Sequence, residues 1–228
     1  MPTVRTATRM TEASELNAVV NSLQLFSAQL PIGAFAFSQG LEAAIDAGQV
    51  TDAESLRAWC LGMLRYGLGT LDCVALRQLM RSSTEAHWLE LNARLLTSRE
   101  TRELRQEDLL LGQALTRWAE GLGLPLIAAG SVSAVSRYAE IARHWGIPES
   151  VAVLGFGWSW LENQMSVAAK SVPLGQRALS QVLTALKPAL VELAGRSVQT
   201  EDPWTNSAFM QSLRSAQHET QYSRLFRS

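Results

Sequence analysis

The hydrophobic positions of the chain recur with the spacing of an α-helix in almost every segment. The first such stripe follows Thr11, a residue type that caps helices, and its apolar positions are Leu16, Val19, Val20, Leu23 and Phe26. Two further helical stretches follow the capping patterns Thr51–Glu54 and Thr97–Glu100. The others lie at Leu41–Gly48, about 71–82, about 85–97, Ser131–Trp145, Pro148–Met165, around Leu179–Leu186 and from about Ser207 onward. No segment shows the strict alternation of a half-buried strand. The pattern therefore predicts an all-α fold of about nine or ten helices packed as a single globular domain.

Prolines, a glycine and one charge pair add detail to this helical pattern. Pro31 and Gly33 end the first stripe, and Pro188 lies inside a later stripe, where it should kink or split the helix. Arg99 and Glu103 are four residues apart, the spacing at which opposite charges pair on a solvated helix face. We therefore expect helix breaks at these prolines and an exposed ion pair between Arg99 and Glu103.

The charges of the chain nearly cancel, with 20 basic and 21 acidic residues. This balance leaves no electrostatic footprint for nucleic acid or an anionic membrane. No apolar run approaches the ~20 residues that span a bilayer, and the first residues lack the apolar stretch of a signal peptide. Cys60 and Cys73 are two thiols in a large chain, which is typical of a reducing compartment. We expect a cytoplasmic protein that binds neither nucleic acid nor membrane.

Three stretches come close to known catalytic or metal-binding motifs and fail on the details. Lys170-Ser171 would close a nucleotide-binding P-loop, but Gln164 occupies the first glycine position. Ser38 lies in a near match to the nucleophile elbow, which requires a strand before the turn, whereas a helix precedes it here. The histidines are far apart and lack further ligands at a strong spacing: His87, His144 and His218. We expect no catalytic residue, no cofactor and no resident metal, with a hydrolase using Ser38 as the less favoured alternative.

Two stretches are richer in special residues than folding alone requires. Leu30–Glu42 (LPIGAFAFSQGLE, the bend) places one proline, two glycines and two aromatics between helices. His218–Ser228 (HETQYSRLFRS, the tail) interleaves Tyr222, Leu225 and Phe226 with Arg224 and Arg227. Aromatic residues and arginine anchor protein interfaces. The tail is therefore either a partner-binding segment or a last turn docked on the chain's own core.

Two glutamates stand among apolar residues, each directly after a leucine. Glu42 and Glu162 are for this reason candidates for buried carboxylates. Glutamate is nevertheless rarely buried without a partner. We therefore expect both side chains at helix surfaces.

Together the bend and the tail resemble the UreF family of urease accessory proteins. The family pattern near the N-terminus is matched at Pro31, Ile32, Gly33, Ala34, Phe35, Ser38, Gly40, Leu41 and Glu42. Thr97–Leu115 and Trp158–Gln176 also resemble the family, and the tail is a family-type ending. Ala36 stands where the family commonly has serine. The resemblance divides the chain into an N-terminal extension with the start of the first helix, 1–20, and a UreF-like domain, 21–228.

The resemblance implies a chaperone rather than an enzyme. UreF proteins are all-α dimers that bind UreD (UreH in some organisms) and recruit the GTPase UreG to the urease apoprotein, where GTP hydrolysis is coupled to nickel insertion. It implies a partner-binding tail at His218, Glu219, Tyr222, Arg224, Leu225, Phe226 and Arg227. It also implies a surface for UreG at Lys170 and the turn of Pro173, Gly175 and Gln176. A helical adaptor unrelated to urease is the alternative.

Overall fold

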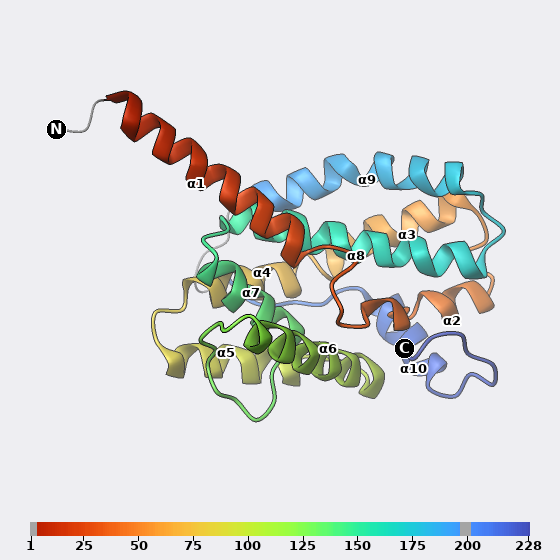
Figure 1. Cartoon of the computed structure of the whole chain (residues 1–228). Helices are drawn as coiled ribbons and strands as arrows, with labels where there is room; N and C mark the ends of the chain where they lie inside the picture. The colour runs from red at the N-terminus through yellow and green to blue at the C-terminus, as the bar shows by residue number, and fades with distance from the viewer. Residues whose placement is uncertain (1–3, 197–201) are drawn as a thin grey trace.

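The computed structural model describes residues 4–196 and 202–228, with side chains from residue 12 onward. Within these residues the chain forms ten α-helices and one short 3-10 turn, and no strand. In chain order they are α1 (Val4–Leu25), the 3-10 turn η1 (Ala34–Ala36), α2 (Leu41–Asp46), α3 (Ala53–Tyr66), α4 (Asp72–Arg81), α5 (Glu85–Thr97), α6 (Arg102–Gly121), α7 (Ala134–His144), α8 (Glu149–Ser171), α9 (Gln176–Gly195) and α10 (Phe209–His218). The predicted all-α class and single-domain organisation are confirmed (Figure 1).

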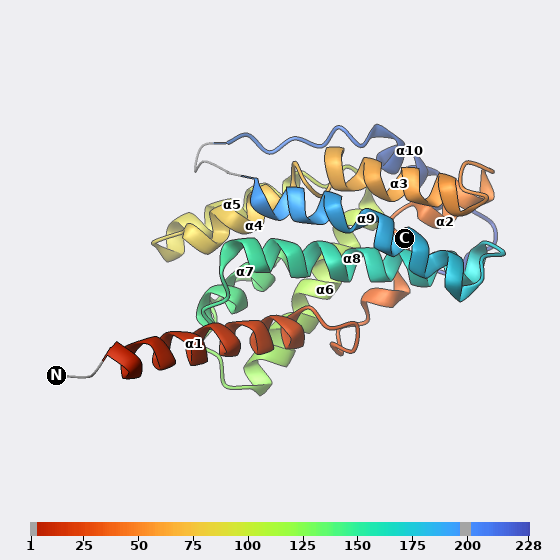
Figure 2. The same ribbon diagram turned by 90° about the horizontal axis from the view of Figure 1, so that it is seen from above.

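Helix α8 is the longest of the helices as far as the structure describes them, and it lies at the centre of the molecule. It runs alongside α9, and α3 packs against both (Figure 2). The other half of the molecule contains α4, α5, α6 and α7, with α7 packed between α4 and α6. Helices α2 and α10 contact each other near the end of the chain, beside the bend. None of the described helices combines the length and hydropathy needed to cross a membrane.

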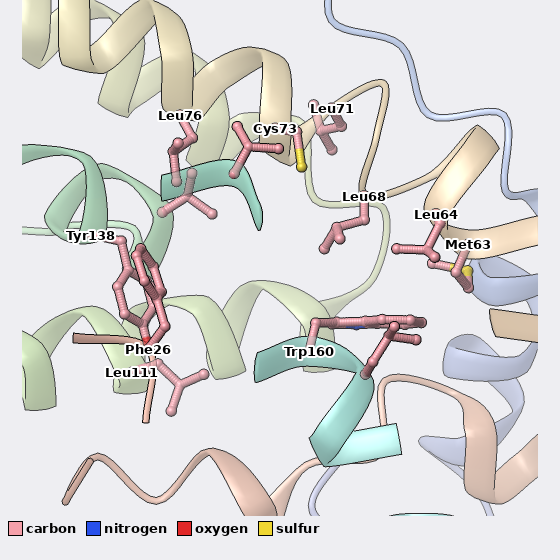
Figure 3. Packing of buried hydrophobic residues seen from close by; sticks show 14 of the residues in the cluster. Phe26, Met63, Leu64, Leu68, Leu71, Cys73, Leu76, Leu111, Tyr138 and Trp160 are labelled. Atoms are coloured by element: carbon pink, nitrogen blue, oxygen red, sulfur yellow. The ribbon is translucent and has the colours of Figure 1, made fainter. Parts of the chain in front are cut away.

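A single hydrophobic core joins these two halves. Tyr138 of α7 stacks on Phe26, with ring centroids 5.4 Å apart, and Figure 3 shows the two rings side by side. Trp160 of α8 lies below Leu68 in the same view. These residues come from segments far apart in the sequence, so the core rather than local propensity fixes how the helices cross.

Helix α1 begins earlier than the capping pattern predicts and leaves its apolar stripe uncovered. It starts at Val4 rather than at Thr11, because the sequence from 3 to 30 contains no proline or glycine to stop it. Four apolar side chains of the stripe are about half exposed or more: Leu16, Val19, Val20 and Leu23. Among the described side chains of residues 12–26, the apolar ones that enter the core are Leu25 and Phe26. In Figure 1 the first half of α1 projects from the body of the protein.

Two helix starts differ in register from the capping patterns. The N-cap of α3 is Asp52, whose carboxylate accepts the Ser55 N–H at 2.8 Å, so the capping box is shifted by one residue from Thr51–Glu54. Thr97 closes α5, and Thr101 caps α6 instead. In both places two capping residues follow one another closely, and packing of the helix decides which is used.

The predicted break at Pro188 does not split α9. The helix continues from Gln176 to Gly195 with the proline inside it. Leu186 and Leu190 flank the proline and are buried. Burial of these leucines therefore compensates for the missing backbone hydrogen bond at Pro188.

Candidate functional site

The bend provides a surface on which α10 docks. Its glycines Gly33 and Gly40 have φ angles of 77° and 85°, in the left-handed region that favours glycine. A Cβ atom on Gly40 would lie 3.1 Å from the Gln211 carbonyl oxygen and 3.2 Å from the Ser215 nitrogen of α10. Gly40 therefore meets two requirements at once, a positive φ and a close approach of backbones.

The tail folds back from α10 and lies against the bend. The Arg227 N–H donates to the Ala36 carbonyl at 2.8 Å, and the Ser38 N–H donates to the Ser228 carbonyl at 2.8 Å. The Ser38 hydroxyl donates to the same Ser228 oxygen. The two stretches singled out in the sequence thus form one structure, although more than 170 positions separate them.

The tail is buried on one side and exposed on the other. Phe226 is 6% exposed and belongs to the core, and His218 is fully buried. Tyr222 is fully exposed and Leu225 is 70% exposed. Docking on the chain's own core accounts for Phe226 and His218 but leaves Tyr222 and Leu225 uncovered.

Glu42 of α2 contacts the tail from inside the protein. Its Oε1 accepts the Leu225 N–H at 2.6 Å, and its Oε2 accepts the Phe226 N–H at 3.1 Å and lies 2.9 Å from His218 Nε2. Glu42 is 6% exposed, so the expectation of a surface position is wrong. The reason is that these donors replace the water that a carboxylate otherwise needs. Glu162 is half-buried.

Glu103 of α6 contacts the same histidine from the opposite side. Its Oε2 lies 2.7 Å from His218 Nδ1, and its Oε1 accepts from Arg224 Nη1 at 2.9 Å. Glu42 and Glu103 therefore enclose the imidazole ring between two carboxylates, and Arg224 of the tail adds a positive charge to the cluster.

The predicted surface pair between Arg99 and Glu103 is wrong. Arg99 lies before the start of α6, so the spacing of a helix does not apply to it. Its guanidinium instead joins two largely buried carboxylates, with Nη2 2.7 Å from Asp72 Oδ1 and Nε 3.0 Å from Asp108 Oδ2. Arg99 thus ties α4 to α6 inside the protein.

Glu107, one turn further along α6, contacts the end of the tail. Its Oε1 accepts from Gln39 Nε2 at 2.5 Å, and its Oε2 accepts the Ser228 hydroxyl at 2.8 Å. Trp160 Nε1 donates to the Gln39 side chain, which links this cluster to α8. Burial raises the pKa of Glu107 to about 7, while the hydrogen bonds from Gln39 and Ser228 oppose the rise. The charge of this carboxyl group therefore changes in the neutral pH range.

The end of α8, which carries Lys170, and the turn after it lie at the same end of the molecule as the tail (Figures 1 and 2). The exposed Lys170 side chain reaches over the Phe226 ring, with Nζ 5.2 Å from the ring centroid. Pro173 and Gly175 are exposed in the connection between α8 and α9, and Gln176 is exposed at the start of α9. The structure thus brings Lys170 into contact with the tail and leaves the turn as free surface beside it.

The contacts of Ser38 do not support the hydrolase alternative. Its side chain is fully buried and donates to a backbone oxygen of the tail rather than facing a histidine. Within the part of the chain that the structure describes, no group of three or more His, Cys, Asp and Glu residues is arranged to hold a metal ion. The geometry of the bend and tail is that of a buried structural contact with an exposed outer side.

Sequence reasoning did not identify Glu103 and Glu107 as contacts of the tail. Their spacing of four residues places both on one face of α6, and Leu111 of the core continues that face. In the sequence, the alignment of two glutamates with an apolar position on one helix face was the pattern that could have indicated buried carboxylates. It could not show which segment supplies the donors, because His218 and Ser228 come from the other end of the chain.

Comparison with known proteins shows the family to which the chain belongs. The family model described as UreF matches residues 50–187. The chain is 42% identical over 221 residues to the urease accessory protein UreF of Chromohalobacter salexigens, covering 92% of this chain and 95% of that protein. It is 38% identical over 225 residues to UreF of Pseudomonas aeruginosa (93% and 100% covered) and 40% identical over 239 residues to UreF of Pseudoalteromonas translucida (99% and 100% covered). The chain belongs to the UreF family of urease accessory proteins.

Proposed function

We propose that the chain is a non-catalytic scaffold in urease maturation. It binds UreD (UreH), recruits the GTPase UreG and helps to couple GTP hydrolysis to nickel insertion into the urease apoprotein. Its family membership supports a role in urease assembly. The observation that carries the scaffold role is the tail, whose backbone is held by buried contacts while Tyr222 and Leu225 face solvent. An anchor that is ordered before binding loses less conformational entropy on association.

The outer side of the tail is the proposed contact with UreD. Tyr222 and Leu225 supply the apolar anchors, and Arg227 and Glu219 lie at the rim, where Glu219 pairs with Arg102 at 3.3 Å. Arg224 is already paired with Glu103. Its role is therefore to shape the tail rather than to reach into the GTPase as an arginine finger.

Lys170 and the turn of Pro173, Gly175 and Gln176 form the proposed surface for UreG. This surface is exposed and lies at the same end of the molecule as the tail, so two partners can meet there. Replacing Lys170 by Ala should leave UreD capture intact and change the yield of active urease in a maturation assay. An unchanged yield would remove Lys170 from this surface.

The uncovered apolar face of α1 supports a homodimer. With α8 and α9 it borders a groove of about 620 Å³ whose lining includes Leu23, Leu154, Trp158 and Val191. Exposed apolar area of this kind marks an interface, and a second copy of the chain is the occupant that the dimeric family implies. We further propose that the protein works in the cytoplasm, with residues 1–20 as an extension of the UreF-like unit 21–228.

Co-purification with the cognate partners tests the proposal. The full chain is produced with UreD, UreG and the urease apoprotein, and each partner in turn carries the affinity tag. We expect tagged UreD to retain the chain, and we expect it to retain UreG only when the chain is also present. Retention with neither partner would contradict the scaffold role.

A further inference from the structure

We propose that Glu42 is the positioning residue of the partner surface: its buried carboxylate sets the conformation of the tail from which Tyr222 and Leu225 project. The conformational part of this inference stands on contacts within the chain. The part that concerns the partner rests on the proposed function. Glu42 itself is buried, so it acts on a partner only through the tail.

The carboxylate of Glu42 accepts two successive backbone N–H groups, those of Leu225 and Phe226. Successive N–H groups that converge on one anion form a concave anion site and fix the local backbone. The two neighbouring side chains then have opposite surroundings, because Leu225 is 70% exposed whereas Phe226 is buried. Glu42 thus determines which of the two side chains is available to a partner.

His218 supplies a third donor to Glu42. Its two contacts also require one proton more than a neutral imidazole between two ionised carboxylates would hold. Both ring nitrogens lie within hydrogen-bond distance of carboxylate oxygens, Nε2 at Glu42 and Nδ1 at Glu103. A carboxylate oxygen accepts, so either the imidazole carries both protons or one carboxyl group is protonated. With the imidazole doubly protonated, the positive charges of His218 and Arg224 balance the two carboxylates in a buried site.

Glu42 accepts the two backbone N–H groups through which the middle of the tail is hydrogen-bonded to a distant part of the chain. Apart from the local bonds of Thr220 to the Gln217 carbonyl, the described hydrogen bonds from residues 220–226 to the chain outside the tail end on Glu42 and Glu103. The backbone bonds to the bend begin only at Arg227. A glutamine at position 42 offers one acceptor oxygen, and its amide N–H₂ would face donors, so at least one of the three bonds is lost.

Hydrogen exchange of the full chain tests the conformational part. The variants are Glu42→Gln, Glu42→Asp, which keeps the charge on a shorter side chain, and the control Glu90→Gln on the exposed face of α5. We expect amides of 219–228 to exchange about tenfold faster or more in both Glu42 variants, because losing a bond to a charged group changes the opening equilibrium by that order. Glu90→Gln should match the wild type. Wild-type exchange of the tail in either folded Glu42 variant would overturn the inference.

Capture of UreD and UreG by the same four proteins tests the link to the partner. We expect the Glu42 variants to lose most of the capture, while Glu90→Gln retains it. Equal capture by a Glu42 variant with a fast-exchanging tail would overturn the positioning role. A wild-type chain that captures neither partner would contradict the proposed function, and the exchange result would still decide whether Glu42 fixes the tail.

Discussion

Glu42 and His218 are 176 positions apart in the chain, and Glu42 Oε2 lies 2.9 Å from His218 Nε2 in the protein interior. This contact joins the bend to the last residue of α10 and so brings together two segments that are far apart in the sequence. The tail beyond it has a buried inner side and an exposed outer side. The tail is therefore a segment that the protein itself holds in place, with one side left open to solvent.

Phe226 should contribute most of the apolar burial that holds the tail. Replacing it by Ala is expected to lower the free energy of unfolding by about 2–4 kcal/mol, since a large buried side chain is lost. Phe209→Ala is the matched control, because Phe209 is 71% exposed and should change stability little. Urea denaturation followed by circular dichroism measures both. Equal effects of the two variants would show that the tail is not seated on the core.

Glu107 should make stability depend on pH in the neutral range. Its pKa in the folded protein is raised from 4.5 to about 7, so the folded state holds the proton more tightly than the unfolded chain. The favourable contribution of this pKa difference to the free energy of unfolding is complete below pH ~4.5 and is lost as pH rises through about 7. Replacing Glu107 by Gln should remove this loss.

The measurement is the free energy of unfolding of the wild type and of Glu107→Gln between pH 5 and pH 8. As pH rises from 5 to 8, the free energy of unfolding of Glu107→Gln is expected to increase relative to that of the wild type by roughly 1–3 kcal/mol, in line with the size of the pKa rise. Glu90→Gln on α5 controls for the general effect of removing a negative charge. A difference between Glu107→Gln and the wild type that stays constant with pH would contradict the assignment.

Gly40 should tolerate no side chain. Gly40→Ala combines a strained positive φ with contacts at 3.1 and 3.2 Å to the backbone of α10. Gly48→Ala has the strain alone, because nothing lies within 4 Å of its Cβ position. We expect Gly48→Ala to cost about 1 kcal/mol and Gly40→Ala roughly 1–3 kcal/mol more, as measured by thermal unfolding. Similar losses at both positions would mean that α10 does not pack on the bend.

The apolar face of α1 should control the oligomeric state. Leu23→Glu places a charge where this face borders the groove and is expected to shift the protein to monomer in sedimentation experiments. Leu122→Glu, at a similarly exposed leucine after α6, should leave the oligomeric state unchanged. A wild-type monomer, or a dimer indifferent to Leu23→Glu, would remove α1 from the interface.

Helical periodicity was sufficient to predict the fold class, because each helix buries a stripe at its own spacing. It located most helices but not their exact starts, as Asp52 and Thr101 show. It also could not tell that the stripe of α1 is left uncovered, since spacing reports amphipathicity and not what covers a face. Continuity of α9 through Pro188 likewise depends on tertiary packing.

The sequence indicated the bend and the tail of the site but not the carboxylates of α6 that contact them. The composition of the bend and the tail drew attention to both, and the structure joins them through Ser38 and Glu42. The carboxylates of α6 were missed, because a glutamate in a helix looks solvated until its donors are known. Those donors, His218 and Arg224, are more than 100 positions away in the chain.

The affinity for UreD of a chain altered only on the outer side of the tail tests the central claim most directly. Tyr222→Ala with Leu225→Ala leaves the buried contacts in place, and Tyr66→Ala with Leu122→Ala removes comparable exposed side chains elsewhere. We expect the tail variant to raise Kd about 30-fold or more, equivalent to roughly 2 kcal/mol, while the control stays within about twofold of the wild type. Unchanged affinity of the tail variant would contradict the claim that the seated tail binds the partner.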